Sequence, residues 1–249
     1  MEKTEGRLFQ LDAVLALAGR GFRGYFESPT AYVVLFVFYL LSGYLLTVPL
    51  FLVNQASIKG FADNLPLLLC FLAPALTMGL LAEELKSGTF ETLATFPLED
   101  WDIVLGKFLG FAATHAVSVA GLAVYPLALS FLVAPPAGLD WGETGGVLLA
   151  LFLLGLMFGA AGLFASSLSK SQIVAFVTAF LLCFAIFAIG KLAQFAPVMM
   201  GRVVEFIGAD AHMDTLAKGV IDTRDLLYFA TGIFGFLYLT VQRLAGRRF

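Results

Sequence analysis

Six long stretches without a charged residue dominate the hydropathy pattern of this chain. A helix rises 1.5 Å per residue, so about 20 apolar residues cross a hydrocarbon core of about 30 Å. Because backbone polar groups cannot stay unpaired in lipid, each stretch is predicted to be a transmembrane helix. In chain order the stretches hold 31, 19, 32, 26, 20 and 17 residues, bounded by Glu27 and Lys59, Asp63 and Glu83, Lys107 and Asp140, Glu143 and Lys170, Lys170 and Lys191, and Asp225 and Arg243.

The pattern therefore predicts an all-α, polytopic membrane protein made of one transmembrane domain over residues 1–249. The six expected spans cover residues 31–53, 64–82, 104–133, 144–168, 171–190 and 226–243.

The amino-acid composition supports this fold class and argues against a water-soluble domain. Hydrophobic residues make up 60% of the chain and charged residues 13%, against about half and a quarter in soluble domains. The net charge of −3 argues against a nucleic-acid partner, which would require clustered Lys and Arg. Cys70 and Cys183 each lie in an apolar run and are expected to be small buried hydrophobes.

Positive charges indicate how the chain is oriented, because Lys and Arg gather in short loops on the cytoplasmic side. Six spans put both termini on one side, and most of the cations fall there, so both termini are predicted to be cytoplasmic. That side holds Lys3, Arg7, Arg20, Arg23, Lys86, Lys107, Lys170, Arg243, Arg247 and Arg248, whereas the other holds Lys59, Lys191, Arg202, Lys218 and Arg224, the last four partly offset by acids.

The N-terminal segment 7–28 is amphipathic. Arg20, Arg23 and Glu27 lie away from its apolar face, which predicts a helix lying in the membrane interface. A cytoplasmic helix packed on a soluble partner is the alternative. The apolar face consists of Leu8, Leu11, Leu15, Ala18, Phe22 and Tyr25.

A second amphipathic segment, 83–97, joins the second and third spans. Gly88 permits a bend midway, and Pro97 stops the helix. A short cytoplasmic helix joined directly to two spans is a suitable point for a soluble motor to push on, whereas the alternative is a solvated loop. Its expected apolar face consists of Leu85, Thr89, Leu93 and Phe96.

The segment between the fifth and sixth spans, 194–222, contains two brief apolar faces that are too short to cross a bilayer. It is expected to form short external helices, or else an ordered loop that seals the outer face. The faces are Val203, Phe206 and Ile207, then Leu216, Val220 and Ile221, and Asp222 is expected to cap the final helix.

Catalytic motifs are missing from the sequence. The fragment Leu105–Phe108 lacks the upstream glycine and the Ser or Thr of a phosphate-binding loop, so the chain is not expected to be an enzyme. His115 and His212 lie in separate segments without companion metal ligands. His115 is the one titratable residue expected deep within a span, with either a direct role or a packing role.

Several motifs in matching order carry a family resemblance. The chain resembles type-2 ABC transporter permeases, and within them the branch typified by the gliding-motility permease subunit. The motifs are Glu83-Glu84-x-Lys86-Ser87-Gly88-Thr89-x-Glu91-x-Leu93-x-Thr95-x-Pro97, Asp102-x-Val104-Leu105-Gly106-Lys107-Phe108, Ser28-Pro29-x-Ala31-Tyr32 and Gly219-Val220-Ile221-Asp222-Thr223-Arg224-Asp225.

The resemblance implies roles for the amphipathic segments. Segment 7–28 corresponds to the family's elbow helix, segment 83–97 to its coupling helix and segment 194–222 to its external helices. By this resemblance, the ATP-binding subunit contacts Glu83, Glu84, Leu85, Lys86, Gly88, Thr89, Glu91, Leu93 and Phe96.

The implied function is that of a permease subunit of an ABC exporter in the bacterial inner membrane. Two ATP-binding subunits would bind ATP and Mg and drive two permease chains, identical or different, with the pathway between them. An accessory membrane protein with a large external domain is a further implied partner.

Gly155, Gly159 and Gly162 permit close helix approach, between permeases or within one chain.

Two other functions remain open. One is a membrane scaffold or anchor of a gliding or secretion machine that moves no cargo. The other is a small channel or secondary transporter, which predicts ion or proton flux by this chain alone and sensitivity to substitution of His115.

Overall fold

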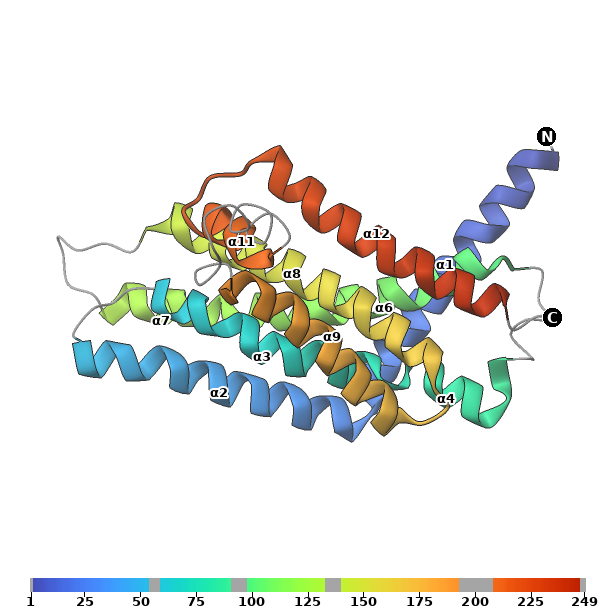
Figure 1. The fold of residues 1–249 in the computed structure, drawn as a ribbon, viewed down its shortest axis with the longest axis horizontal. Helices are drawn as coiled ribbons and strands as arrows, with labels where there is room; N and C mark the ends of the chain where they lie inside the picture. The colour runs from blue at the N-terminus through green and yellow to red at the C-terminus, as the bar shows by residue number, and fades with distance from the viewer. Residues whose placement is uncertain (1, 54–58, 91–97, 133–139, 193–207, 247–249) are drawn as a thin grey trace.

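The computed structural model describes residues 2–53, 59–90, 98–132, 140–192 and 208–246, and every regular element within these ranges is a helix (Figure 1). Six stretches are long and apolar enough to cross a membrane, which confirms the predicted all-α fold class with six spans. They are Pro29–Thr47, Asp63–Ser87, Asp100–Phe131, Trp141–Leu168, Gln172–Leu192 and Thr223–Ala245.

Two of the spans are built from two helices each, α3 with α4 and α6 with α7. The helices are α1 (Glu2–Glu27), α2 (Pro29–Val53), α3 (Lys59–Thr77), α4 (Gly79–Ser87), α6 (Asp100–Leu122), α7 (Val124–Leu132), α8 (Trp141–Leu168), α9 (Gln172–Leu192), α11 (Ala209–Ala217) and α12 (Thr223–Ala245).

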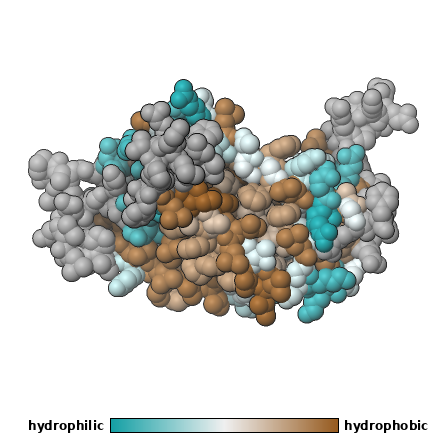
Figure 2. Space-filling view, viewed as in Figure 1, coloured by the Kyte–Doolittle hydropathy of each residue, from teal (hydrophilic) through white to brown (hydrophobic). Residues whose placement is uncertain are grey.

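The spans form a bundle around α8, which packs against α3, α6, α9, α11 and α12. In the most apolar part of the α8 span, 67% of the residues are buried, against 17% in the α2 span. The helix α8 is therefore the centre of the bundle, and α2 lies at its edge. The start of α1, the end of α12 and α4 lie at one end of the bundle, and α7 and α11 lie at the other (Figure 1). Figure 2 shows a broad apolar belt between more polar ends, as a protein surrounded by lipid requires.

Glycines on α8 let the neighbouring helices approach closely. A Cβ atom on Gly159 would lie 1.8 Å from the Phe111 ring of α6, and one on Gly162 would lie 2.0 Å from Thr77 Oγ1 of α3. A Cβ on Gly155 would lie 2.0 Å from Nε2 of His115. The three glycines therefore serve packing within the chain, one of the two roles that the sequence left open.

His115 occupies a packed interior position and is only 1% exposed. Its ring is stacked between those of Phe111 and Phe152, with both centroid distances 5.8 Å. This aromatic enclosure favours the packing role for His115.

The helix α1 crosses α6 where α6 carries two glycines. Cβ atoms on Gly106 and Gly110 would lie 2.7 Å from Leu17 Cβ and 3.0 Å from the Ala18 carbonyl oxygen, respectively. The Tyr25 hydroxyl at the end of α1 donates a hydrogen bond of 2.6 Å to the carbonyl of Leu76, and burial raises the pKa of this hydroxyl. These contacts fix α1 on the bundle.

Part of the predicted apolar face of α1 stays open. Leu11 and Leu15 are exposed, so in the chain alone they are available to lipid. Placement of α1 in the membrane interface remains a prediction.

At the opposite end of the bundle, α11 packs on α8 and directly precedes α12, the last span. His212 Nδ1 lies 2.6 Å from Asp225 Oδ1, both side chains are buried, and the His212 ring stacks on Tyr228 at 4.1 Å. This pair joins α11 to α12. As predicted, Asp222 caps α12, and it accepts a hydrogen bond of 2.9 Å from the backbone N–H of Arg224.

The apolar face expected from Leu216, Val220 and Ile221 does not exist as one helix face. The helix α11 ends at Ala217, and Gly219 then adopts a φ of 76°, so the chain turns before Val220. Leu216 is buried whereas Val220 and Ile221 are exposed. The other expected face, of Val203, Phe206 and Ile207, lies outside the described residues.

Candidate functional site

The candidate site is the charged end of the second span, where α4 lies. The prediction ended this span at residue 82, but α4 carries the helix on to Ser87. Gly88 then adopts a left-handed conformation with a φ of 74°, which glycine tolerates better than any other residue. The first half of the predicted coupling segment is therefore a direct extension of the span.

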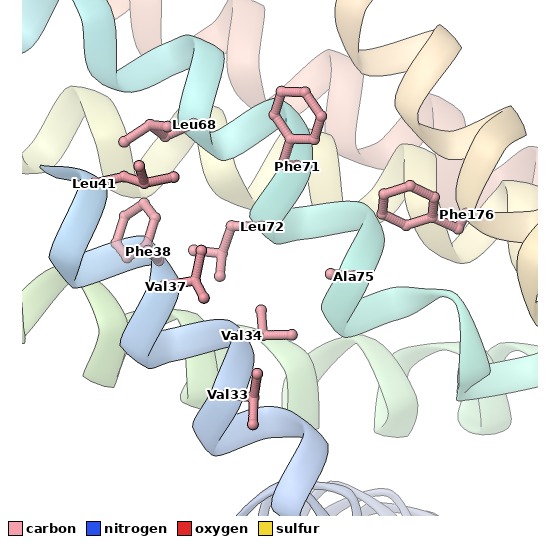
Figure 3. A pocket seen from close by; sticks show the side chains of 10 residues that line it. All are labelled: Val33, Val34, Val37, Phe38, Leu41, Leu68, Phe71, Leu72, Ala75 and Phe176. Atoms are coloured by element: carbon pink, nitrogen blue, oxygen red, sulfur yellow. The ribbon is translucent and has the colours of Figure 1, made fainter.

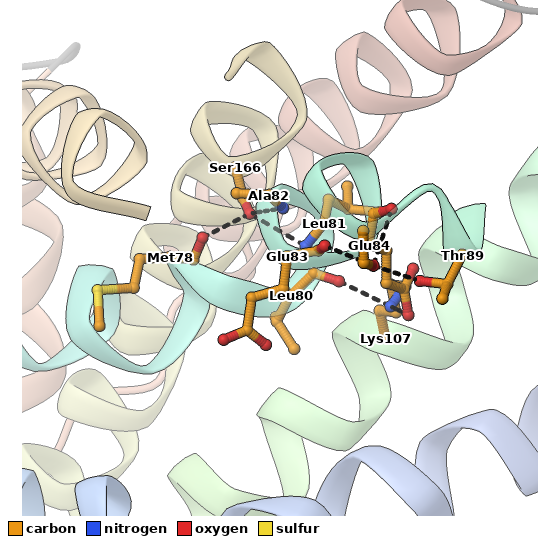
Figure 4. Close-up of polar contacts among 10 residues, drawn as sticks. Met78, Leu80, Leu81, Ala82, Glu83, Glu84, Thr89, Lys107 and Ser166 are labelled. Carbon is orange, nitrogen blue, oxygen red and sulfur yellow. Dashed lines mark hydrogen bonds and ion pairs between the residues drawn. The ribbon is translucent and has the colours of Figure 1, made fainter. Parts of the chain in front are cut away.

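A serine from the centre of the bundle is inserted where α3 meets α4 (Figure 4). Ser166 Oγ of α8 accepts hydrogen bonds of 3.0 Å from the backbone N–H groups of Leu81 and Ala82, and it donates one of 2.9 Å to the carbonyl of Met78. The first N–H groups of a helix have no partner within that helix, and Ser166 satisfies two of them. This hydroxyl fixes the start of α4 to α8.

Lys107 of α6 holds the other side of α4. Its Nζ donates hydrogen bonds of 2.7 Å to the Leu80 carbonyl and 2.6 Å to Glu84 Oε1. The Lys107 side chain is 11% exposed and that of Glu84 31% exposed, so the ion pair is largely removed from water. Lys107 therefore binds α4, because two acceptors on that helix lie within its reach.

A third connection runs to α9. Gln172, the first residue of α9, donates a hydrogen bond from Nε2 to Glu83 Oε1. The helix α4 is therefore bonded to α6, α8 and α9 at once. A displacement of α4 would be transmitted to three spans besides its own.

The start of α6 is stabilised by its own acidic residues. Asp102 Oδ2 accepts a hydrogen bond of 2.9 Å from the Glu99 N–H, and Asp100 adds negative charge to the first turn. Acidic side chains are favourable at the positive end of a helix dipole. The helix that follows the predicted coupling segment is therefore well capped at its N-terminus.

The predicted contact residues divide into two groups. Leu85 is buried in the core and Glu84 is paired with Lys107, so both serve the chain itself. Exposed positions available to a partner are Glu83, Lys86, Gly88 and Thr89, while Glu91, Leu93 and Phe96 lie outside the described residues.

Sequence reasoning did not identify Ser166 or Gln172 as part of this site. Each lies more than 80 residues from its partner along the chain, and no local pattern distinguishes them from other polar residues at span ends. The charged segment from Glu83 onward pointed to the site, but no feature of the sequence linked it to Ser166 or Gln172.

The described part of the chain offers no metal centre, since no group of three or more His, Cys, Asp or Glu side chains comes together there. The structure is that of a polytopic membrane protein whose second span ends in a charged helical extension at one end of the bundle.

A comparison with protein families is consistent with this class. Residues 45–240 match the family described as ABC-2 family transporter protein, which is more than three quarters of the chain. The chain therefore belongs to the ABC-2 transporter family, whose members are non-catalytic transmembrane permease subunits and generally pair with ATP-binding subunits. No curated protein matches the sequence. The match identifies the family but gives no support for the gliding-motility branch within it.

Proposed function

We propose that this chain is the membrane-spanning subunit of an ABC exporter, and that the segment beginning with α4 receives motion from an ATP-binding subunit. The observation that supports this most directly is the bonding of α4 to α6, α8 and α9 through Lys107, Ser166 and Gln172. Because α4 is bonded to three other spans, a displacement of α4 is transmitted to them with little local bending.

The mechanism follows from this connection. Two ATP-binding subunits close on ATP and push on α4 and residues 88–97, and the spans of two permease chains then separate toward the outside. Export, the gliding-motility branch and an accessory membrane protein rest on the resemblance of the motifs. The charge distribution supports cytoplasmic termini, and the bacterial inner membrane rests on the resemblance of the motifs.

The exposed cation Lys86 provides the test of docking. Lys86→Glu reverses a charge that makes no ion pair with any described residue, so the fold should be retained while binding of the ATP-binding subunit falls. Lys218→Glu is the matched control, because Lys218 is also exposed but follows α11 at the opposite end.

The measurement is the amount of nucleotide-binding subunit that co-purifies with the full chain, together with its rate of ATP hydrolysis. The proposal expects a loss of several-fold for Lys86→Glu and none for Lys218→Glu. Equal co-purification with both variants would refute docking at α4. Normal docking together with hydrolysis that never responds to the permease would favour a scaffold.

A further inference from the structure

Two adjoining cavities lie beside α2 and α3. One has a volume of about 470 Å³, is open to the outside and is lined by residues of α1, α2, α3, α4, α6 and α9 at the α4 end of the bundle. The other, of about 380 Å³, is a groove among α2, α3 and α9 (Figure 3). Val34 and Ala75 line both, so the cavities meet at these two side chains.

The first cavity has charges of both signs. Arg20, Lys107, Glu83 and Glu84 line it. Glu84 is bonded to Lys107 through Oε1, and its Oε2 is buried out of reach of a ligand, whereas Glu83 is exposed and accepts a hydrogen bond from Gln172 at Oε1. Arg20 is exposed and forms no ion pair with any side chain that the structure describes. The cavity therefore offers the second carboxylate oxygen of Glu83 and the guanidinium group of Arg20.

These two groups favour different parts of a ligand. A carboxylate oxygen accepts a charge-assisted hydrogen bond from an ammonium N–H, which is stronger than a bond between neutral groups. A guanidinium group matches the oxygens of a phosphate and binds them through two parallel hydrogen bonds. A ligand with both an ammonium and a phosphate would satisfy the cavity without adding net charge to it.

The second cavity is suited to a hydrocarbon chain. All ten side chains that line it are apolar, and none carries a nitrogen or oxygen atom (Figure 3). Val33, Val37 and Phe71 are exposed in the chain alone, so the groove opens toward the surrounding lipid. Each CH₂ group buried there contributes about 0.8 kcal/mol.

We propose that the two cavities together bind one phospholipid with a primary ammonium headgroup, of the phosphatidylethanolamine type. Its ammonium donates to Glu83 Oε2, its phosphate accepts from Arg20 and one acyl chain lies along the groove past Val34 and Ala75. The polar cavity reaches Ser28 and Thr30 at the junction of α1 and α2, where a headgroup at the membrane surface would lie. The lipid joins α1 to the spans and to α4.

Native mass spectrometry of the purified, delipidated full chain tests this binding. Dioleoyl lipids with ethanolamine, choline or glycerol headgroups are added separately, and the fraction of protein with one bound lipid is measured. The ethanolamine lipid is expected to bind about tenfold more tightly than the choline lipid, whose quaternary ammonium cannot donate a hydrogen bond. Equal binding of the two, or stronger binding of the anionic glycerol lipid, would overturn the proposal.

Two arginines of α1 make a matched pair of variants. Arg20→Ala is expected to lower the affinity for the ethanolamine lipid about tenfold, because it removes a charge-assisted contact with the phosphate. Arg23 is exposed on the same helix but does not line the cavity, so Arg23→Ala should leave the affinity unchanged. The same affinity in both variants would overturn the headgroup site.

A third variant tests the acyl groove. Ala75→Leu fills the junction of the cavities and should weaken binding of the ethanolamine lipid several-fold, while thermal unfolding of the variant checks that the bundle is retained. Unchanged binding would overturn the assignment of the groove. None of these measurements involves an ATP-binding subunit, so their failure is distinct from failure of the coupling proposal.

Discussion

Replacing Ser166 with alanine removes one hydroxyl that makes three hydrogen bonds where α3 meets α4. The side chain is completely buried, so water cannot replace it at the N–H groups of Leu81 and Ala82 or at the Met78 carbonyl. A net contribution of about 1 kcal/mol per hydrogen bond gives a loss of about 3 kcal/mol. For a chain of this size, this loss corresponds to a decrease in Tm of roughly 6–12 °C.

Ser118→Ala is the matched control for this substitution. Ser118 is also fully buried, but its hydroxyl donates to the Thr114 carbonyl one turn earlier in the same helix, and that carbonyl keeps its place in α6. We expect a loss below about 1 kcal/mol for the control.

Two assays in the same detergent measure the effect. Thermal unfolding gives the global stability, and hydrogen exchange reports the amides at the start of α4, which should exchange up to about 100-fold faster in Ser166→Ala. If Ser166→Ala and Ser118→Ala gave equal Tm values and equal exchange at Leu81 and Ala82, the role of Ser166 in fixing α4 would be refuted.

Two further predictions concern the stability of the bundle. Gly159→Val should destabilise the chain by about 1–3 kcal/mol, because its Cβ would lie 1.8 Å from a buried aromatic ring. Gly145→Val, where a Cβ has no neighbour within 4 Å, is its control, and equal thermal unfolding of the two would contradict close packing at α8. His212→Ala should cost about 3 kcal/mol, since it leaves the buried Asp225 carboxylate without its partner. The double variant His212→Ala with Asp225→Ala should recover part of that loss in the same assay, and no recovery would contradict the pairing.

Much of the fold follows from local features of the sequence. The six spans were predictable because a helix in lipid requires about 20 apolar residues, and charged residues interrupt the chain between such stretches. The start of α6 also depends on local sequence, since Asp100 and Asp102, which stabilise this helix end, lie within its first turn.

The candidate site was only partly predictable. The segment from Glu83 onward was recognisable from its charges and its glycine, but the sequence placed Leu85 on a surface available to a partner, whereas the structure buries it in the core. Helical periodicity identifies which residues share a face and does not identify what that face contacts. The left-handed turn at Gly88 further separates Leu85 from the residues that follow.

The sequence by itself determined that this is an all-helical membrane protein with six spans and a charged segment between the second and third. Only the tertiary structure decided that α8 is central, that α2 is peripheral and that Lys107 and Ser166 hold α4. Lipid is as apolar as a protein core, so hydropathy cannot distinguish a face that packs on another helix from one that meets lipid. Hydrogen bonds between residues more than 80 positions apart depend on how the spans are arranged, and no local pattern in the chain encodes that arrangement.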